Sequence, residues 1–394
     1  MVERVDPPRT IEWVGIETPA FIYDENLLTA AVTRVARTAA TTGCRLLYTL
    51  KPFSIADALR LLAGHVAGFA ASSVFEAELA REVLGPRGSV HLTAPGLRAQ
   101  DLPDVNQFCD HVSFNSLSQL ARLGPELDSG ISRGLRVNPQ LSFVTDPRYD
   151  PCRIASRLGT PLGELARTFE TSPELLAGLD GLHFHSNCDS DDLGQLRQTV
   201  EHLQSSLDPR LFGSIRWLNM GGGYLFASDQ QEDELCGAVE RARSVHGLEI
   251  FIEPGAALVR DAGFFVSTVV DLFASDGHTI AVLDTTVNHM PEVYEYQFEP
   301  EVLGHTEHGE FEYTLAGCSC LAGDIFGHYA FDHELAVGST IVFGSSGAYT
   351  MVKAHMFNGI NLPTVYARTP SGEVVLKKRF AYEDFTSRCG VTTT

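Results

Sequence analysis

Short apolar runs alternate with longer amphipathic segments between residues 20 and 255, and this pattern constrains the fold more than any other feature of the sequence. The runs expected to form strands are Phe21–Tyr23, Cys44–Leu50, Val66–Ala70, Ser89–Leu92, His111–Phe114, Gly134–Val137, Gly181–His185, Ile215–Met220 and Leu248–Ile252. Helical patterns lie between them, as in Ile55–Leu62, Val74–Leu84 and Leu117–Leu123, and Ser172-Pro173-Glu174 predicts a further helix start. Strict alternation of strands and helices predicts a parallel sheet, and about eight such units favour a closed (β/α)8 barrel.

After Gly255 the sequence pattern changes to β-branched and aromatic runs separated by turn residues. The expected strands are Phe264–Leu272, Thr279–Asp284, Glu310–Leu315, Thr340–Phe343, Thr364–Arg368 and Glu373–Leu376. The chain is therefore predicted to be an α/β protein with a barrel over residues 20–255. Residues 1–19 and 256–394 are expected to form a separate β-rich domain.

Composition limits the environment and the partners. The charge of −21, from 29 basic and 50 acidic residues, disfavours nucleic acid or an anionic membrane as a partner and mildly favours a cationic one. No signal-peptide pattern opens the sequence, and no apolar run reaches the length of about eighteen residues that a membrane span needs. The eight cysteines are scattered and suit free thiols in a reducing compartment. We therefore expect a cytoplasmic protein.

Lys51 closes the apolar run Arg45-Leu-Leu-Tyr-Thr-Leu-Lys51 and is followed at once by Pro52. Barrel enzymes carry their reactive groups at the carboxyl ends of the strands. An amine there can form an imine with an aldehyde cofactor, although a solvated lysine at a strand end would look the same.

Three further motifs follow predicted strands. Gly221-Gly222-Gly223 can bring backbone N–H groups close to a phosphate, or can simply form a tight turn. His183 and His185 have the spacing of one strand face, which suits a cofactor-stacking ring, a packed histidine or a metal ligand, but no third ligand stands at a matching spacing. Glu253, before Pro254-Gly255, can hold the proton of a pyridinium ring through a charge-assisted hydrogen bond, or can be a loop carboxylate.

Two later segments mix small and polar residues as loops that line a site do. They are Gly317-Cys-Ser-Cys-Leu-Ala-Gly-Asp324 and Gly347-Ala-Tyr-Thr-Met-Val-Lys-Ala-His-Met-Phe-Asn-Gly359.

In order and spacing these motifs resemble the fold-type III pyridoxal-phosphate decarboxylases, the superfamily of ornithine and diaminopimelate decarboxylases, over nearly the whole chain. The carboxynorspermidine decarboxylase branch is the most similar. The segments that carry the resemblance include Leu50-Lys-Pro-Phe53, Ala71-Ser-Ser73 with Glu76, Ser156-Arg-Leu-Gly159, Gly181-Leu-His-Phe-His185, His289-Met-Pro291, Ser319-Cys-Leu-Ala-Gly-Asp324 and Tyr349-Thr-Met-Val-Lys353. The resemblance implies an alanine-racemase-like barrel with a C-terminal β-rich domain and pyridoxal 5′-phosphate as the cofactor.

The resemblance also implies roles for single residues. Those of the cofactor site are Lys51 as the Schiff-base lysine, His185 as the ring-stacking residue, Glu253 as the partner of the ring nitrogen, and Gly222, Gly223 and Tyr349 as the phosphate site. Cys320 would return a proton, and Asp324 would hold the far amine of the substrate in a neighbouring subunit's site. This implies a homodimer with shared active sites.

Ala256 and Leu321 stand where ornithine and diaminopimelate decarboxylases have arginine and an acidic residue, which favours the carboxynorspermidine branch. Asn187-Cys188-Asp189-Ser190 departs from that branch and leaves the substrate open.

We therefore predict decarboxylation of an α-amino acid with a distal amine, first carboxynorspermidine or carboxyspermidine in polyamine biosynthesis. Asp284 and Asp324 are the candidates for the distal ammonium, because a desolvated cation requires a carboxylate. The alternative is a related enzyme that decarboxylates a 3-amino-3-carboxypropyl group, or another amino acid, in a specialised pathway. A racemase and an inactive regulatory homologue are the remaining hypotheses.

Overall fold

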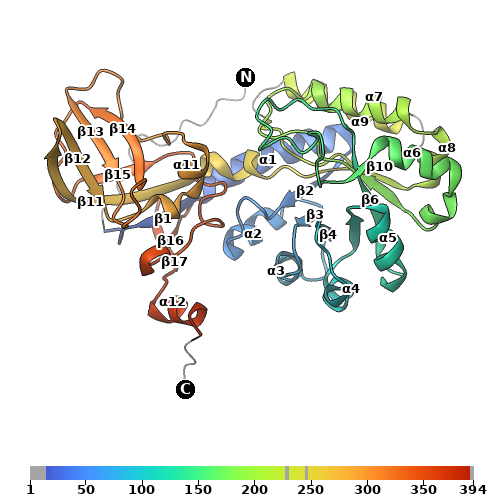
Figure 1. Cartoon of the computed structure of the whole chain (residues 1–394), viewed down its shortest axis with the longest axis horizontal. Coiled ribbons are helices and arrows are strands. Elements are labelled where there is room, and N and C mark those ends of the chain that lie inside the picture. The colour runs from blue at the N-terminus through green and yellow to red at the C-terminus, as the bar shows by residue number, and fades with distance from the viewer. Residues whose placement is uncertain (1–14, 227–229, 245–246, 391–394) are drawn as a thin grey trace. The chain divides into compact units, whose positions relative to one another are not determined.

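The computed structural model describes residues 15–226, 230–244 and 247–390, and these form two compact units. The first is Ala30–Leu258, and the second combines residues 15–29 with residues 259–390. Figure 1 shows the strands and helices of each unit.

The first unit is a closed barrel of eight parallel strands, as predicted. Its strands are β2 (Arg45–Thr49), β3 (Gly68–Ala71), β4 (Ser89–Thr93), β5 (His111–Phe114), β6 (Ser132–Asn138), β8 (Gly181–His183), β9 (Trp217–Asn219) and β10 (Glu249–Ile252). Pairing of β10 with β2 and of β5 with β6 closes the ring, and the short β7 (Thr160–Pro161) extends β6. Leu47, Ala70, Trp217 and Phe251 form one cluster of its core.

The helices of this unit follow the strands. They are α1 (Glu25–Thr42), which begins in the second unit, α2 (Ala56–Ala63), α3 (Val74–Leu84), α4 (Leu102–Phe108), α5 (Leu117–Leu123), α6 (Leu162–Thr171), α7 (Gly194–Ser206), α8 (Pro209–Ser214), α9 (Gln230–Arg243) and α10 (Ala256–Val259). The prediction that a helix starts at Ser172 is wrong in the type of helix that forms there. Pro173–Leu176 is only a 3₁₀ turn after α6, and the Ser172 side chain caps nothing because α6 ends at that point.

A serine cap begins α3 directly after its strand. Ser73 Oγ accepts from the Glu76 N–H at 3.2 Å, and Glu76 Oε2 accepts from the Ser72 N–H at 2.6 Å. The same arrangement begins α5, where Ser116 Oγ accepts from the Gln119 N–H at 3.1 Å. These caps satisfy backbone donors that a helix end leaves free. At α3 the cap also fixes Glu76 beside the carboxyl end of β3.

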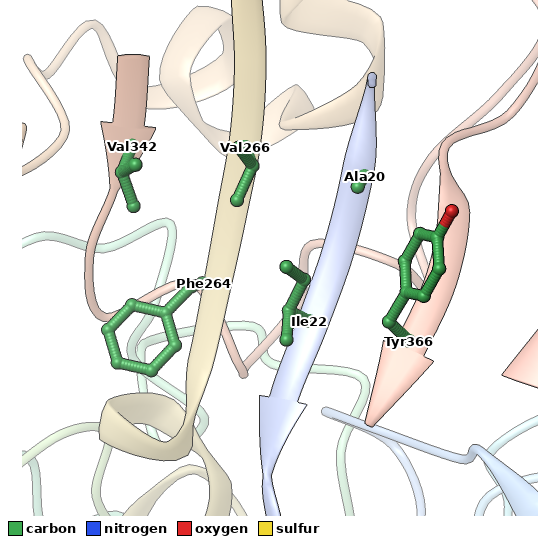
Figure 2. Close-up of a cluster of buried hydrophobic side chains, with 6 residues drawn as sticks. All are labelled: Ala20, Ile22, Phe264, Val266, Val342 and Tyr366. Carbon is green, nitrogen blue, oxygen red and sulfur yellow. The ribbon is translucent and has the colours of Figure 1, made fainter. Parts of the chain in front are cut away.

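The second unit is a mixed sheet in the order β14-β13-β12-β11-β1-β16-β17, with β15 paired to β11. Its strands are β1 (Ala20–Asp24), β11 (Gly263–Ser275), β12 (His278–Leu283), β13 (Phe311–Ala316), β14 (Ile325–Phe331), β15 (Thr340–Phe343), β16 (Thr364–Arg368) and β17 (Val374–Lys378). Its helices are α11 (Pro291–Tyr296) and α12 (Tyr382–Arg388). Figure 2 shows a buried cluster on four of these strands, made of Ala20, Ile22, Phe264, Val266, Val342 and Tyr366.

The structure corrects the boundary predicted at residue 20. Strand β1 is not a barrel strand, because it pairs antiparallel with β11 and parallel with β16. Its residues are buried throughout, so its apolar pattern is that of a central strand in either kind of sheet. The expected membership of residues 1–14 lies outside the described residues.

Across the described ranges, no helix combines the length and apolarity needed to cross a membrane. All eight cysteines are free thiols.

Candidate active site

The predicted site residues of the barrel follow four of its strands, at their carboxyl ends. Lys51 comes after β2, His185 after β8, the glycines 221–223 after β9 and Glu253 after β10. The strands are parallel and closed into a ring, so these ends share one face of the barrel. The barrel therefore brings together the residues that the sequence predicted for the cofactor, apart from Tyr349.

Glu253 is held by two neighbours. Asn219 Nδ2 donates to its Oε1 at 2.6 Å, and His183 Nε2 lies 3.5 Å from its Oε2. Burial alone would raise the pKa of Glu253, but His183, the Asn219 hydrogen bond and the charge of Lys51 together hold that pKa below its usual value. The carboxylate is thus ionised and oriented, as a partner for a protonated ring nitrogen must be.

The ring of His185 is fixed by the glycine turn. The Gly222 N–H donates to His185 Nδ1 at 3.1 Å, which leaves Nε2 as the protonated nitrogen of a neutral ring. Burial, followed by the charges of Lys51 and Arg136, places the pKa of His185 well below its ordinary value. A neutral ring held from one edge is suited to stacking on an aromatic cofactor.

Three glycines are required in this turn because backbone approaches it from two sides. A Cβ on Gly222 would lie 2.1 Å from Glu253 O, and one on Gly223 would lie 2.2 Å from Asn187 O. The Gly221 N–H donates to Asn219 Oδ1 and the Gly222 N–H to His185. Of the three, only the Gly223 N–H has no acceptor within the described part of the chain. Phosphate binding at Gly222 would need its N–H to be shared with His185.

Lys51 has an accessible side chain, and its amine makes no hydrogen bond or ion pair with the described residues. The protein around it still lowers its pKa, first by removing water from the amine and then through the positive charge of Arg136. Glu253 and Glu76 oppose this shift. A lysine that is open at one end and easier to deprotonate than usual is suited to forming an imine with an aldehyde.

These features fit pyridoxal 5′-phosphate. The open Lys51 amine can bond the aldehyde carbon, the ionised Glu253 can pair with the ring nitrogen, and the free Gly223 N–H can contact the phosphate. Among the residues that the structure describes, no group of three His, Cys, Asp or Glu side chains could hold a metal ion, the other role considered for His183 and His185.

Cys320, Asp324, Asp284 and Tyr349 lie in the second unit. Cys320 is exposed on the loop between β13 and β14, and its N–H donates to Asn358 Oδ1 at 2.9 Å. Tyr349 has a left-handed backbone with φ of 58°. The segments 317–324 and 347–359 singled out in the sequence therefore meet at Cys320 and Asn358.

Asp324 and Asp284 use their carboxylates within the second unit. Asp324 is 4% exposed and accepts from the N–H groups of Val287, at 2.7 Å, and Ser319, at 2.9 Å, and from the Ser319 hydroxyl. Asp284 accepts from Ser267, the Thr268 N–H and Thr18 at 2.5 to 2.9 Å. Both carboxylates have a structural role here, and their predicted binding of a distal ammonium remains a prediction.

Sequence reasoning missed two residues of the barrel site, Asn219 and Arg136. Asn219 is 1% exposed and connects the glycine turn to Glu253. Arg136 is 9% exposed on β6 and lies near the charges of Lys51 and Glu253. The sequence signal available for both was a polar residue in an otherwise apolar strand, which is Arg136 in Gly134-Leu-Arg-Val-Asn138 and Asn219 in Trp217-Leu-Asn-Met220.

Comparison with known proteins gives matches along nearly the whole chain. Residues 28–260 match the family model described as pyridoxal-dependent decarboxylase, pyridoxal binding domain. The chain is 36% identical to carboxyaminopropylagmatine decarboxylase from Synechocystis sp., over 95% of this chain and 96% of the relative. It is 30% identical to carboxynorspermidine/carboxyspermidine decarboxylase from Campylobacter jejuni, over 95% and 98%.

Among solved structures, the carboxynorspermidine decarboxylase of Campylobacter jejuni complexed with norspermidine matches with a TM-score of 0.86 and 29% identity, over 95% of this chain and all of that one. The diaminopimelate decarboxylase of Helicobacter pylori shares the fold, with a TM-score of 0.80 at 20% identity and coverage of 96% and 98%.

These matches confirm the class first, an alanine-racemase-like barrel with a second, β-rich domain. The family model covers more than half of the chain, and the protein therefore belongs to the pyridoxal-dependent decarboxylases. The predicted similarity to the carboxynorspermidine branch is also confirmed.

Proposed function

We propose that this enzyme uses pyridoxal 5′-phosphate to decarboxylate the carboxyaminopropyl derivative of a cationic amine. One observation supports this most: Lys51, whose amine has no bonded partner in the described chain, and the ionised Glu253, which accepts from Asn219, follow strands at one face of the barrel. The chain that carries them is 36% identical to a carboxyaminopropylagmatine decarboxylase.

The bound cofactor would supply an electron sink for the pair left when CO₂ departs. Lys51 would hold the cofactor covalently and give way to the substrate's α-amine. Glu253 would keep a proton on the ring nitrogen, and its bond to Asn219 keeps the carboxylate aimed at that atom. His185 would cover one face of the ring and exclude water from it.

Cys320 is the candidate for returning a proton to the α-carbon. Its exposure on a loop fixed by Asn358 and Asp324 is consistent with this role. The predicted homodimer, with this loop completing a neighbouring subunit's site, belongs to the same proposal. Sedimentation of the holoenzyme should give a dimer, and mixing Lys51→Ala with Cys320→Ala subunits should restore part of the activity that each variant lacks.

The substrate class follows from what the relatives' names share. Carboxyaminopropylagmatine, carboxynorspermidine and carboxyspermidine all carry the group to be decarboxylated on an amine and differ at the far end, which is a guanidinium in the first and an ammonium in the others. The sequence favoured the carboxynorspermidine type. The 36% identity to the agmatine-type enzyme, against 30% and 28% to the other two, favours the alternative of a different carrier molecule.

The test is an absorption spectrum of the purified protein with pyridoxal 5′-phosphate, before and after borohydride, followed by a CO₂-release assay. We expect an imine band that borohydride fixes onto Lys51 and that Lys51→Ala lacks. The assay compares carboxyaminopropylagmatine, carboxynorspermidine, carboxyspermidine, ornithine and diaminopimelate. Preference for a carboxyaminopropyl compound supports the proposal, and its far end defines the branch. An imine band with release of CO₂ from ornithine or diaminopimelate alone would overturn the substrate class.

A further inference from the structure

The second unit contains a cavity of about 380 Å³ at the beginning of β13, on the part of the sheet that β11, β12 and β13 form (Figure 1). Its walls come from the hairpin of β11 and β12, from Glu310–Tyr313 and from the turn at Glu334 and Leu335. The loop 317–324 that carries Cys320 follows the opposite end of β13, and none of the residues assigned above to the barrel site lines the cavity. The cavity is therefore a separate candidate site.

Three glutamates line this cavity. The carboxylates of Glu310, Glu312 and Glu334 make no hydrogen bond or ion pair with the residues that the structure describes. Across the same described ranges, no group of three acidic, histidine or cysteine side chains could hold a metal ion, so these carboxylates do not converge on one point. The cavity therefore suits positive charges that are spread along a molecule, and not a single metal cation.

The sequence around the cavity has one sign of charge. No lysine or arginine occurs between Arg260 and Lys353, whereas this stretch contains six aspartates and eight glutamates. It supplies 14 of the 50 acidic residues of the chain and none of the 29 basic ones. A concave surface with one sign of charge concentrates ligands of the opposite sign. The charge of this part of the chain therefore favours a cation in the cavity.

The rest of the wall is largely aromatic and aliphatic. It includes Phe273, Phe311, Tyr313, Leu272 and Leu335. Aromatic rings attract alkylammonium groups, and apolar walls bury the methylenes between such groups. Tyr313 is 6% exposed, and its hydroxyl oxygen accepts from the Leu335 N–H at 2.9 Å. The second lone pair and the hydrogen of this buried hydroxyl have no partner in the described chain, so a ligand amine can supply one.

We propose that this cavity binds a linear polyamine, an aliphatic chain that carries two or more ammonium groups. The ammonium groups pair with the carboxylates of Glu310, Glu312 and Glu334, and the methylenes between them lie against the apolar walls. This inference goes beyond the proposed function, whose amine product belongs to the same chemical class. It gives the enzyme a second amine site, made entirely of residues of the second unit.

Equilibrium dialysis of the holoenzyme against spermidine tests this, at about 0.15 M salt, where attraction between distant charges is screened. Wild type is compared with two triple variants that remove the same charge from the second unit. The cavity variant carries Glu310→Gln, Glu312→Gln and Glu334→Gln. The matched control replaces three exposed glutamates that do not line the cavity, and it carries Glu307→Gln, Glu373→Gln and Glu383→Gln.

We expect wild type and the control to bind one spermidine per chain that the cavity variant binds about tenfold more weakly, as the loss of several exposed ion pairs predicts. Spermidine that binds in the barrel is common to the three proteins and cancels in the difference. Equal losses in the cavity variant and the control would mean that the overall negative charge attracts the polyamine, and would overturn the inference. Displacement of spermidine by Mg²⁺ at equal ionic strength would also overturn it.

Thr279→Trp tests the cavity without a change of charge. Thr279 is exposed on β12 and lines the cavity, so an indole there fills the volume at a strand position that tolerates an aromatic side chain. We expect this variant to lose the same spermidine while its unfolding midpoint stays at that of wild type. Undiminished binding in Thr279→Trp would overturn the inference. The binding measurements do not depend on the imine of Lys51, so this inference and the proposed function can be overturned separately.

Discussion

Two charged side chains of the barrel site differ from the buried carboxylate of the second unit's loop 317–324 in whether the protein itself supplies their bonding partners. In the barrel, Lys51 and Arg136 carry charges with no bonded partner in the described chain. In the second unit, Asp324 is nearly fully buried and each of its oxygens accepts from the protein's own donors. Unpaired charge is costly to a fold, so it persists where a ligand completes it. The barrel is organised for an incoming molecule, whereas the loop is organised to keep its own shape.

This comparison also explains why the carboxylates differ in function. Glu253 has a depressed pKa and keeps its charge while facing the Lys51 side of the barrel. Asp324 stabilises backbone donors and so positions the neighbouring Cys320. Under the proposed function Glu253 would serve the chemistry directly, whereas Asp324 holds the shape of the loop that carries Cys320.

Glu253→Gln should give the largest effect on catalysis. An amide cannot hold a positive ring nitrogen, so we expect kcat to fall roughly a hundredfold to a thousandfold while the cofactor still binds through Lys51. Steady-state CO₂ release and the absorption spectrum measure the two effects. Activity within a few fold of wild type would remove Glu253 from the chemistry and break the contrast with Asp324.

Cys320→Ala tests the proposed proton donor in the second unit. Loss of a positioned proton donor should lower kcat by roughly a hundredfold. Cys320 is exposed, so the midpoint of urea unfolding should not change. Cys318→Ala, on the same loop and also exposed, is the matched control and should remain close to wild type. Equal losses in both variants would mean that the loop, and not the Cys320 thiol, matters.

The sequence predicted most of the fold because periodicity and turn residues are local signals. Helices α3 and α5 and strands β15 and β16 have the predicted bounds, since serine caps and β-branched runs define them. Strand β1 was placed in the wrong sheet because a fully buried run does not encode its neighbours. Strand β14 was missed because Ile325–Phe331 contains a glycine and a histidine that interrupt the apolar pattern.

Some residues of the candidate site could likewise be predicted from local sequence signals, and others could not. Lys51, His185 and Glu253 could be predicted because each follows a strand in the sequence. The sequence shows Arg136 only as a polar residue within an apolar strand, and its burial in the barrel depends on residues distant in sequence that only the folded structure places around it. The internal partners of Asp324 and Asp284 depend on donors distant in sequence, such as Val287 and Thr18, and were equally out of reach.

Asp324→Asn tests whether the buried carboxylate of the second unit stabilises the fold. An amide group facing the Ser319 and Val287 donors loses at least one charge-assisted hydrogen bond, so the free energy of unfolding should fall by about 2–3 kcal/mol. Urea unfolding of the apoprotein measures this without substrate. A variant of unchanged stability with a KM raised only for substrates with a distal cation would instead restore the predicted binding of the distal ammonium.

The smallest expected effect concerns His289 in the second unit. The residue is fully buried, its Nδ1 lies 2.9 Å from Thr285 Oγ1, and burial lowers its pKa to about 4, with Asp324 opposing the shift. The unfolded chain, with a histidine pKa of about 6.5, therefore binds a proton that the folded protein refuses, and stability is lost as the pH falls below that value.

We expect wild type to lose about 2 kcal/mol more than His289→Gln between about pH 8 and about pH 5, because glutamine has no proton to gain. Urea unfolding at both pH values, in both proteins, gives the difference directly. Buried histidines of the barrel, such as His183, contribute equally to the pH dependence of unfolding in both proteins, so their contribution cancels in the difference. Identical pH dependence would mean that His289 takes up its proton without cost, which a buried ring beside a satisfied Asp324 should not do.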